Sequence, residues 1–134
     1  MVDAMGAETE SRPRTVLFLE DDPDFAAETE AALRDSGLNV LLAADPWQAL
    51  SQLDSGTAID LLLADVRMPP GTPHGFAVAR MARHRRPRLR LMFITGYRDL
   101  VAKEEPPPGP ILFKPIASGD LVREVNRALA SAGT

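Results

Sequence analysis

The sequence predicts an α/β protein in which a doubly wound, five-stranded parallel sheet is covered by helices on both faces. Five short apolar runs alternate with segments of helical spacing, and this alternation favours right-handed crossovers and parallel pairing. The runs are continuously apolar, as strands of a sheet covered on both faces require. They are Thr15–Leu19, Asn39–Ala43, Asp60–Ala64, Leu89–Thr95 and Ile111–Phe113.

Start and stop signals place the helices between these strands. Asp22–Pro23 and Asp45–Pro46 each combine an N-cap residue with proline at the first helical position, and Gly37 and Gly56 end the two helices that follow. A third helix follows Gly75, and the last opens at Ser118. The residues expected to be buried, helix by helix, are Phe25, Thr29, Ala32, Leu33 and Ser36; Ala49, Leu50 and Leu53; Val78, Met81 and Ala82; and Leu121, Val122, Val125, Ala128 and Leu129.

The remaining helix, the fourth along the chain, is expected to be short or irregular. Only Arg98 to Glu105 are available for it before Pro106, Pro107 and Pro108. Proline inside a helix costs roughly 3 kcal/mol, so the helix must end before these prolines.

Length and composition predict one domain. The chain has 134 residues and no cysteine, which excludes disulfides and thiolate chemistry. No apolar run approaches the ~20 residues of a membrane helix, and no secretory signal is visible. We therefore expect a cytoplasmic protein without a membrane partner, with a disordered lead-in over residues 1–13 and a single domain over residues 14–131.

Charge is distributed unevenly along the chain. Residues 20–30 hold six acidic residues and no basic one, whereas residues 80–90 hold six arginines, His84 and no acid. A basic cluster can bind nucleic acid, but no aromatic residue is interleaved for base stacking. We interpret the basic segment as a solvated helix face and do not expect nucleic-acid binding.

Chemically active side chains follow four of the predicted strands. Glu20–Asp22 follow the first strand, Asp65 follows the third, Thr95 ends the fourth and Lys114 follows the fifth. The carboxyl ends of parallel strands meet at one edge of the sheet, where ligands bind. Three carboxylates at neighbouring strand ends repel one another, and a hard cation such as Mg²⁺ resolves that repulsion. Lysine and hydroxyl groups nearby can hold phosphate oxygens.

Each of these groups also has an ordinary structural explanation. The acidic trio alone could cap a helix, and Asp65 alone could begin a turn. Thr95 alone could be a satisfied hydroxyl and Lys114 a surface charge. Their combination at four strand ends, in this order, favours the functional interpretation.

The segments VLFLEDDP, LLLADVRMPPG, FITGY and ILFKP resemble the defining segments of response-regulator receiver domains. The resemblance covers about Arg14 to Ala130. It implies a flavodoxin-like sheet with strand order 2-1-3-4-5. It also implies that an aspartate accepts a phosphoryl group from a histidine kinase or a histidine phosphotransfer protein, with Mg²⁺ bound.

The resemblance assigns the metal ligands residue by residue. Glu20 and Asp21 match the acidic pair of the family, with Asp21 as a direct ligand and Glu20 acting through water. Asp65 contributes its carboxylate, and Arg67 contributes its backbone carbonyl. Asp22 lies one place beyond the pair, so its expected role is to cap the first helix.

The phosphoryl contacts are assigned in the same way. Asp65 is the expected phosphoacceptor, Thr95 is expected to hydrogen-bond a phosphoryl oxygen, and Lys114 is expected to pair with another. The Lys114–Pro115 bond is expected to be cis, as in the family.

Two departures from the family pattern concern the readout of phosphorylation. The aromatic switch residue of most receivers is replaced by Ile111, and Phe113 lies next to the lysine, where strand alternation points it the other way. FITGY resembles the Phe-Ala-Thr-Gly-Tyr signature of a subgroup that lacks the switch aromatic, although Ile94 replaces the alanine.

Tyr97 stands at the mouth of the expected pocket. We hypothesise that Tyr97 and the Arg67 side chain hinder hydrolysis of the acyl phosphate. The alternative is that Tyr97 only packs over the loop.

The expected function is that of a stand-alone receiver which relays phosphate or switches a partner-binding surface for an unidentified output protein. It is not expected to be an enzyme, beyond assisting its own phosphorylation and dephosphorylation. The main alternative is a non-phosphorylated interaction module that keeps only the fold. A phosphohydrolase is a third class, but Arg67 occupies the place where that class needs a second catalytic aspartate.

Overall fold

The computed structural model describes residues 12–102 and 106–131. Most of the expected lead-in and the end of the expected fourth helix, residues 103–105, lie outside the described residues. The strands are β1 (Thr15–Leu19), β2 (Asn39–Ala43), β3 (Leu61–Asp65), β4 (Arg90–Thr95) and β5 (Ile111–Phe113). The helices are α2 (Pro23–Asp35), α3 (Pro46–Leu53), α4 (Gly75–Arg85), α5 (Arg98–Ala102) and α6 (Ser118–Ala130).

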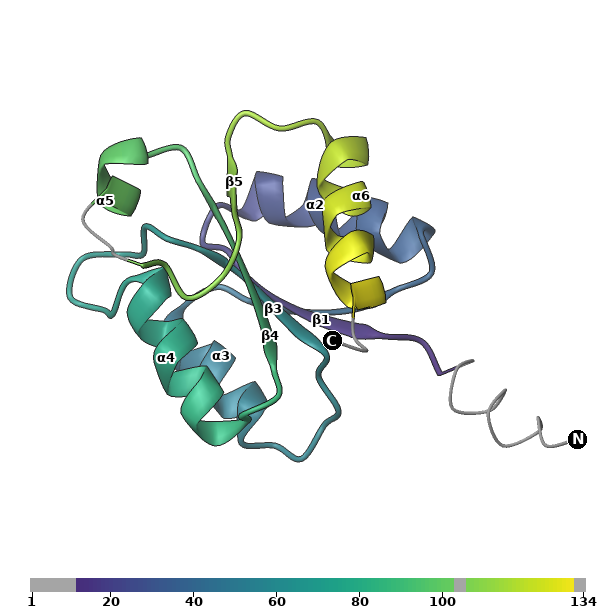
Figure 1. The fold of residues 1–134 in the computed structure, drawn as a ribbon, viewed down its shortest axis with the longest axis horizontal. Helices are drawn as coiled ribbons and strands as arrows, with labels where there is room; N and C mark the ends of the chain where they lie inside the picture. The colour runs from purple at the N-terminus through teal and green to yellow at the C-terminus, as the bar shows by residue number, and fades with distance from the viewer. Residues whose placement is uncertain (1–11, 103–105, 132–134) are drawn as a thin grey trace, which may run out of the picture.

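The five strands form one parallel sheet in the order β2-β1-β3-β4-β5. This is the flavodoxin-like order, so the predicted fold class and strand order are confirmed (Figure 1). In the central register Leu62 lies between Leu17 and Leu91. Because all pairs are parallel, the carboxyl ends of the strands meet at one edge.

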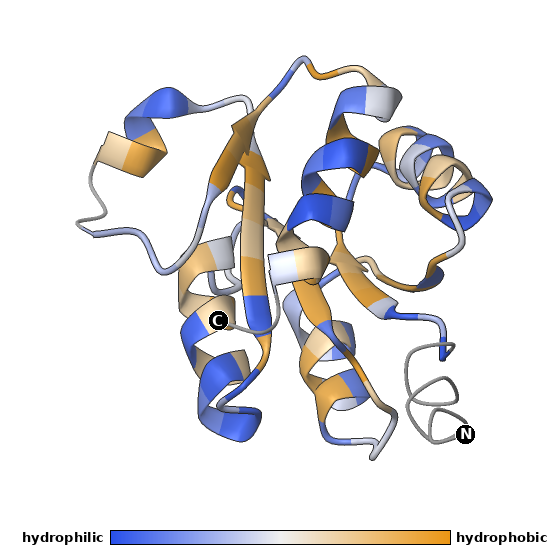
Figure 2. Ribbon diagram, turned by 45° about the vertical axis from the view of Figure 1, so that its right-hand side comes forward, coloured by the Kyte–Doolittle hydropathy of each residue, from blue (hydrophilic) through white to orange (hydrophobic). Residues whose placement is uncertain are grey.

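Helices cover both faces of the sheet. On one face, α3 and α4 pack over a core that includes Leu17, Leu62 and Phe93. On the other, α2 and α6 pack over a core that includes Phe18 and Leu63. The strands are mostly apolar, with polar residues such as Arg90 at their ends, whereas polar and apolar residues alternate along the helices (Figure 2). Among the described helices, none has both the length and the apolar character needed to cross a membrane.

Both predicted N-caps are confirmed by hydrogen bonds. The Asp22 carboxylate accepts from the backbone N–H groups of Asp24 and Phe25 at the start of α2, at 3.0 and 3.4 Å. Asp45 accepts from the N–H of Gln48 at 2.9 Å at the start of α3. These side chains satisfy N–H groups that have no partner inside the helix.

The prediction that Ser36 is buried on the first helix is wrong. Ser36 is exposed and lies at the C-cap of α2, beyond the last helical residue. Its hydroxyl donates to the carbonyl of Leu33 at 2.8 Å, which also accepts from the backbone N–H groups of Ser36 and Leu38. The Ser36 side chain therefore caps the last turn and does not face the sheet. The apolar face of α2 is completed by Ala26 instead.

The third strand begins one residue later than predicted, and Asp60, just before it, binds Arg12 and the backbone of Thr15 through its side chain. Its carboxylate accepts from the backbone N–H of Thr15 at 2.8 Å and from both terminal nitrogens of Arg12, at 2.9 and 3.3 Å. Burial alone would raise the pKa of Asp60, but these hydrogen bonds and the positive charges of Arg12 and Arg14 together hold that pKa below its usual value. The contact ties residue 12 to the amino-terminal edge of the sheet.

The helix limited by prolines is short, as predicted. Within the described residues α5 covers Arg98–Ala102, and none of these five residues is buried. Leu100 and Val101 pack only partly against the core on the α3–α4 face. Few apolar contacts therefore hold this helix to the domain.

The basic segment is more than a solvated face. Arg86 makes three hydrogen bonds at 2.6–3.0 Å, to the backbone carbonyls of Leu53 and Thr57. Arg85 pairs with Asp54 at 2.9 Å. These contacts fasten the end of α4 to the end of α3, where helix carbonyls lack partners inside the helix.

Candidate functional site

The carboxyl edge of the sheet collects most of the residues that the sequence assigned to the site. Glu20 follows β1, Asp65 ends β3, Thr95 ends β4, and Lys114 follows β5. Strands β1 and β3 are direct neighbours, and β4 and β5 follow in order, so residues 94 positions apart in sequence come into contact.

Three carboxylates come together at this edge. Glu20, Asp21 and Asp65 each offer an oxygen, and the three oxygens lie within 4.8 Å of one another. Glu20 and Asp65 are buried and Asp21 is exposed. Hard oxygen donors with an open side are the ligands that Mg²⁺ prefers. These residues therefore fit the predicted metal.

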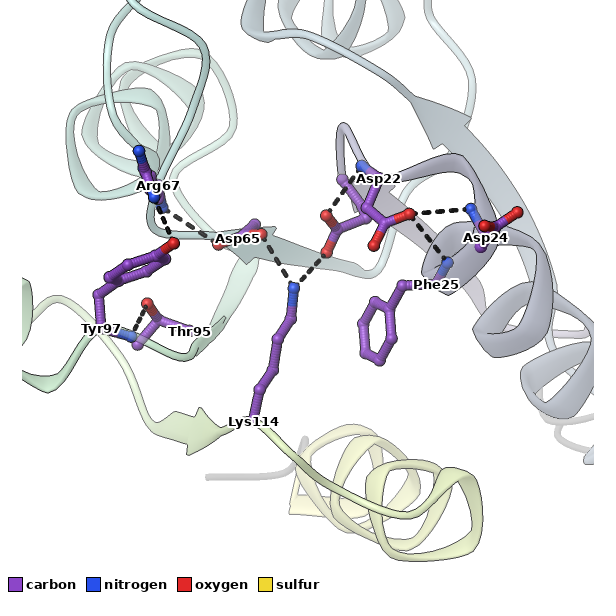
Figure 3. A network of polar contacts seen from close by, with 9 residues as sticks. Asp22, Asp24, Phe25, Asp65, Arg67, Thr95, Tyr97 and Lys114 are labelled. Atoms are coloured by element: carbon purple, nitrogen blue, oxygen red, sulfur yellow. Dashed lines mark hydrogen bonds and ion pairs between the residues drawn. The ribbon is translucent and has the colours of Figure 1, made fainter.

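Both oxygens of the Asp65 carboxylate are held in place. The backbone N–H of Arg67 donates to Oδ1 at 3.1 Å, and the ammonium of Lys114 donates to Oδ2 at 3.2 Å. Asp65 is only 6% exposed. Figure 3 shows Lys114 reaching from the end of β5 to Asp65.

The charges of the cluster shift two pKa values. Burial and the negative charge of Asp65 raise the pKa of Glu20 to about 7. Burial alone would lower the pKa of Lys114, but Asp65 and Glu20, whose Oε1 lies 3.1 Å from Nζ, raise it above its usual value. One ammonium thus pairs with two of the three carboxyl groups, and the site favours an additional cation.

A cavity opens beside these groups. Its volume is about 280 Å³, and Asp65 lies in its wall. Its lining comprises Glu20, Asp21, Asp22, Asp65, Arg67, Met68, Pro69, Pro70, Tyr97 and Lys114. The phosphoacceptor predicted from sequence is therefore within reach of a small substrate.

Thr95 is placed beside this cavity and does not line it. The pairing of Asp65 with Ile94 puts Thr95 one residue beyond Asp65 along the sheet. Thr95 is fully buried, and its hydroxyl oxygen accepts from the backbone N–H of Tyr97 at 3.0 Å. The hydroxyl oxygen therefore accepts a hydrogen bond within the loop, while the hydroxyl can still donate a hydrogen bond to a ligand.

Arg67 and Tyr97 contact each other across the mouth of the cavity (Figure 3). The Arg67 guanidinium donates to the Tyr97 hydroxyl, and its central carbon lies 4.6 Å from the centre of the ring. The contact joins the loops after β3 and β4. It places both side chains where the sequence hypothesis needs them.

Gly75 brings the start of α4 against the backbone of Asp65, a contact that its sequence position as a helix start did not reveal. It is the first residue of α4, and its N–H donates to the Val66 carbonyl at 2.8 Å. A Cβ atom at this position would lie 2.3 Å from the Asp65 carbonyl oxygen and 2.8 Å from Cα of Val66. Only glycine permits this approach.

The prediction that strand alternation points Phe113 away from the face of Ile111 is wrong. Ile111 packs against the core on the α3–α4 face, while Leu112 packs against the opposite core. Phe113, two residues from Ile111, shares its face by strand alternation. The Arg98 guanidinium of α5 lies over the Phe113 ring, 4.0 Å from its centre. An aromatic ring is thus present beside α5, one position before the lysine.

The predicted cis bond between Lys114 and Pro115 is also present.

Comparison with known proteins agrees with this fold. Residues 16–126 match the family described as the response regulator receiver domain. The chain belongs to this family.

Three relatives illustrate the range of similar proteins. The response regulator receiver protein CpdR of Brucella abortus is 31% identical over 122 residues, which cover 89% of this chain and 99% of CpdR. The crystal structure of a response regulator receiver protein from Sinorhizobium medicae has a TM-score of 0.80 at 31% identity and covers 90% of this chain and 98% of that one. The receiver domain of the hybrid histidine kinase CckA has a TM-score of 0.72 at 32% identity, covering 86% and 98%.

Proposed function

We propose that this receiver domain accepts a phosphoryl group on Asp65 as the signal-receiving part of a two-component pathway. The observation that carries the proposal is the Asp65 carboxylate, which lies in the wall of an open cavity with both oxygens held, by the Arg67 N–H and by Lys114. A carboxylate fixed in this way is oriented for attack on phosphorus.

The proposed donor is a histidine kinase or a histidine phosphotransfer protein. A carboxylate oxygen of Asp65 forms a bond to phosphorus, the bond from phosphorus to the donor imidazole breaks, and its electrons leave with the imidazole. During the transfer Lys114 pairs with one phosphoryl oxygen, and the Thr95 hydroxyl donates a hydrogen bond to another. These contacts position and stabilise a loose transition state.

The proposed metal is Mg²⁺, held by the carboxylates of Asp21 and Asp65 and by the carbonyl of Arg67, with Glu20 acting through water. The fit rests on three carboxylate oxygens within 4.8 Å of one another. Bound Mg²⁺ would neutralise negative charge on the phosphoryl group. Asp21, the exposed member, is the most accessible to an arriving ion.

We further propose that the domain acts as a stand-alone cytoplasmic receiver, which relays phosphate or switches a surface read by an output protein. The similarity to CpdR, a receiver protein covered over 99% of its length, supports this. The chain is proposed to be a phosphoacceptor that assists its own phosphorylation and dephosphorylation, and not an enzyme acting on other substrates.

The test is incubation of the purified protein with a small phosphodonor and Mg²⁺, followed by separation of phosphorylated from free protein. We expect wild type to gain phosphate, and expect Asp65→Asn, or wild type with a metal chelator, to gain none. An Asp65→Asn protein that is labelled as well as wild type would contradict the proposal. A folded wild type that takes up no phosphate would support the non-phosphorylated interaction module.

A further inference from the structure

A ring from α2 lies against the lysine of the site. The Lys114 ammonium nitrogen lies 4.4 Å from the centre of the Phe25 ring, a cation–π geometry. Figure 3 shows this ring beside the end of the Lys114 side chain. The sequence indicated only that Phe25 belongs to the buried face of the first helix.

Two elements fix the ring in this place. Phe25 follows the N-cap Asp22, which accepts from its backbone N–H at 3.4 Å. The ring also meets Phe18 of β1 edge to face, with centres 6.2 Å apart. Phe25 is partly buried, so its ring has one side in the core and another toward Lys114. The same residue thus joins the core to the site.

We infer that Phe25 is a positioning residue that holds the Lys114 ammonium at the phosphoacceptor. Three described contacts locate this ammonium: Glu20 at 3.1 Å, Asp65 at 3.2 Å and the Phe25 ring. A divalent cation competes with the ammonium for the two carboxylates, and phosphorylation converts the Asp65 carboxylate to an acyl phosphate, but neither event removes the neutral ring. The ring therefore keeps Lys114 in place when the carboxylates are engaged. This inference rests on the proposed function of Asp65.

The direct test is the NMR signal of the Lys114 side chain. Lys103 and Lys114 are the two lysines of the chain, so Lys103→Arg assigns the Lys114 signals. A methylene group held over a ring face is shielded, and we expect the ε-protons of Lys114 to resonate upfield of an exposed lysine. In Phe25→Leu the shielding should disappear, and in Phe25→Tyr, which keeps the ring, it should persist.

The functional test compares phosphorylation rates of the same variants with a small phosphodonor. A cation–π contact at a partly exposed site corresponds to roughly a two- to five-fold change. We expect Phe25→Leu to be slowed by about this factor and Phe25→Tyr to retain the wild-type rate. Ala32→Gly is the matched control: it weakens α2 away from the ring, and should change neither the rate nor the NMR signal.

The outcomes separate this inference from the proposed function. If wild type is phosphorylated while Phe25→Leu retains the wild-type rate and the shielded Lys114 signal, the inference is wrong and the acceptor role of Asp65 stands. If Ala32→Gly slows the reaction as much as Phe25→Leu, Phe25 acts only through stability and the inference is equally wrong. If wild type takes up no phosphate, the proposed function itself fails.

Discussion

Replacement of Gly75 by alanine tests how closely helix α4 must approach the phosphoacceptor. The new Cβ would lie 2.3 Å from the Asp65 carbonyl oxygen and 2.8 Å from Cα of Val66. Both neighbours are backbone atoms of the loop that carries Asp65, so no flexible side chain can move aside. Restoring a contact of roughly 3.5 Å requires a displacement of about 1 Å.

The clash in Gly75→Ala should affect both the stability of the domain and the rate of phosphorylation. Overpacking of this kind destabilises a domain by about 1–3 kcal/mol, and a displacement of about 1 Å at a reacting group slows a reaction by up to ~10²-fold. We expect Gly75→Ala to lower the unfolding free energy by about 1–3 kcal/mol and to slow phosphorylation of Asp65 by at least ~10-fold. The assays are urea denaturation and phosphorylation by a small phosphodonor.

Gly119→Ala provides the matched control. Gly119 lies in the first turn of α6, and a Cβ there meets nothing within 4 Å. The alanine should leave phosphorylation unchanged and stabilise the helix by at most ~1 kcal/mol. If Gly75→Ala matched wild type to within about 0.5 kcal/mol and accepted phosphate at the same rate, the close approach of α4 would not position Asp65.

Three further predictions concern other contacts of the domain. Asp60→Asn should lower the unfolding free energy by about 1–3 kcal/mol, because the charge-assisted bonds from Arg12 and the N–H of Thr15 are weakened. Folding lowers the pKa of Asp60, so the stability that its carboxylate contributes is present above the unfolded-state pKa and disappears as the pH falls through the folded-state pKa. The urea midpoints of wild type and Asp60→Asn should therefore converge in strong acid. Tyr97→Ala should shorten the lifetime of the phosphoprotein, measured after donor removal, and an unchanged lifetime would leave Tyr97 as a packing residue only. Arg86→Ala should lower the unfolding free energy by about 1–3 kcal/mol, because three hydrogen bonds to α3 and the residues after it are lost. Arg88→Ala, at an exposed position of the same segment, should change the unfolding free energy by less than ~0.5 kcal/mol. Equal effects of the two substitutions would refute the role of Arg86 in joining α4 to α3.

Local signals predicted most of the fold. The strands were located to within one residue at their ends because a sheet covered on both faces makes each strand a continuous apolar run. The caps at Asp22 and Asp45 were predictable because capping depends on neighbouring residues in the chain. Ser36 shows where this reasoning stops, since helical spacing alone does not reveal that the helix ends one residue earlier.

The site was predictable as a set of residues but less so as a set of contacts. The strand ends indicated Glu20, Asp65 and Lys114, and parallel pairing brings them together. By contrast, the contact of Phe25 with Lys114 and the approach of Gly75 to Asp65 depend on how helices seat on the sheet. Such tertiary distances leave no periodic signal in the chain.

The most direct measurement of the central claim is chemical identification of the phosphorylated residue. Wild-type protein is treated with a small phosphodonor and Mg²⁺, reduced with borohydride, which converts an aspartyl phosphate to homoserine, and digested for peptide mass spectrometry. We predict homoserine at position 65 and unmodified aspartate at positions 21 and 60. Homoserine at another position, or its absence from position 65 in phosphorylated protein, would contradict the assignment of Asp65 as the acceptor.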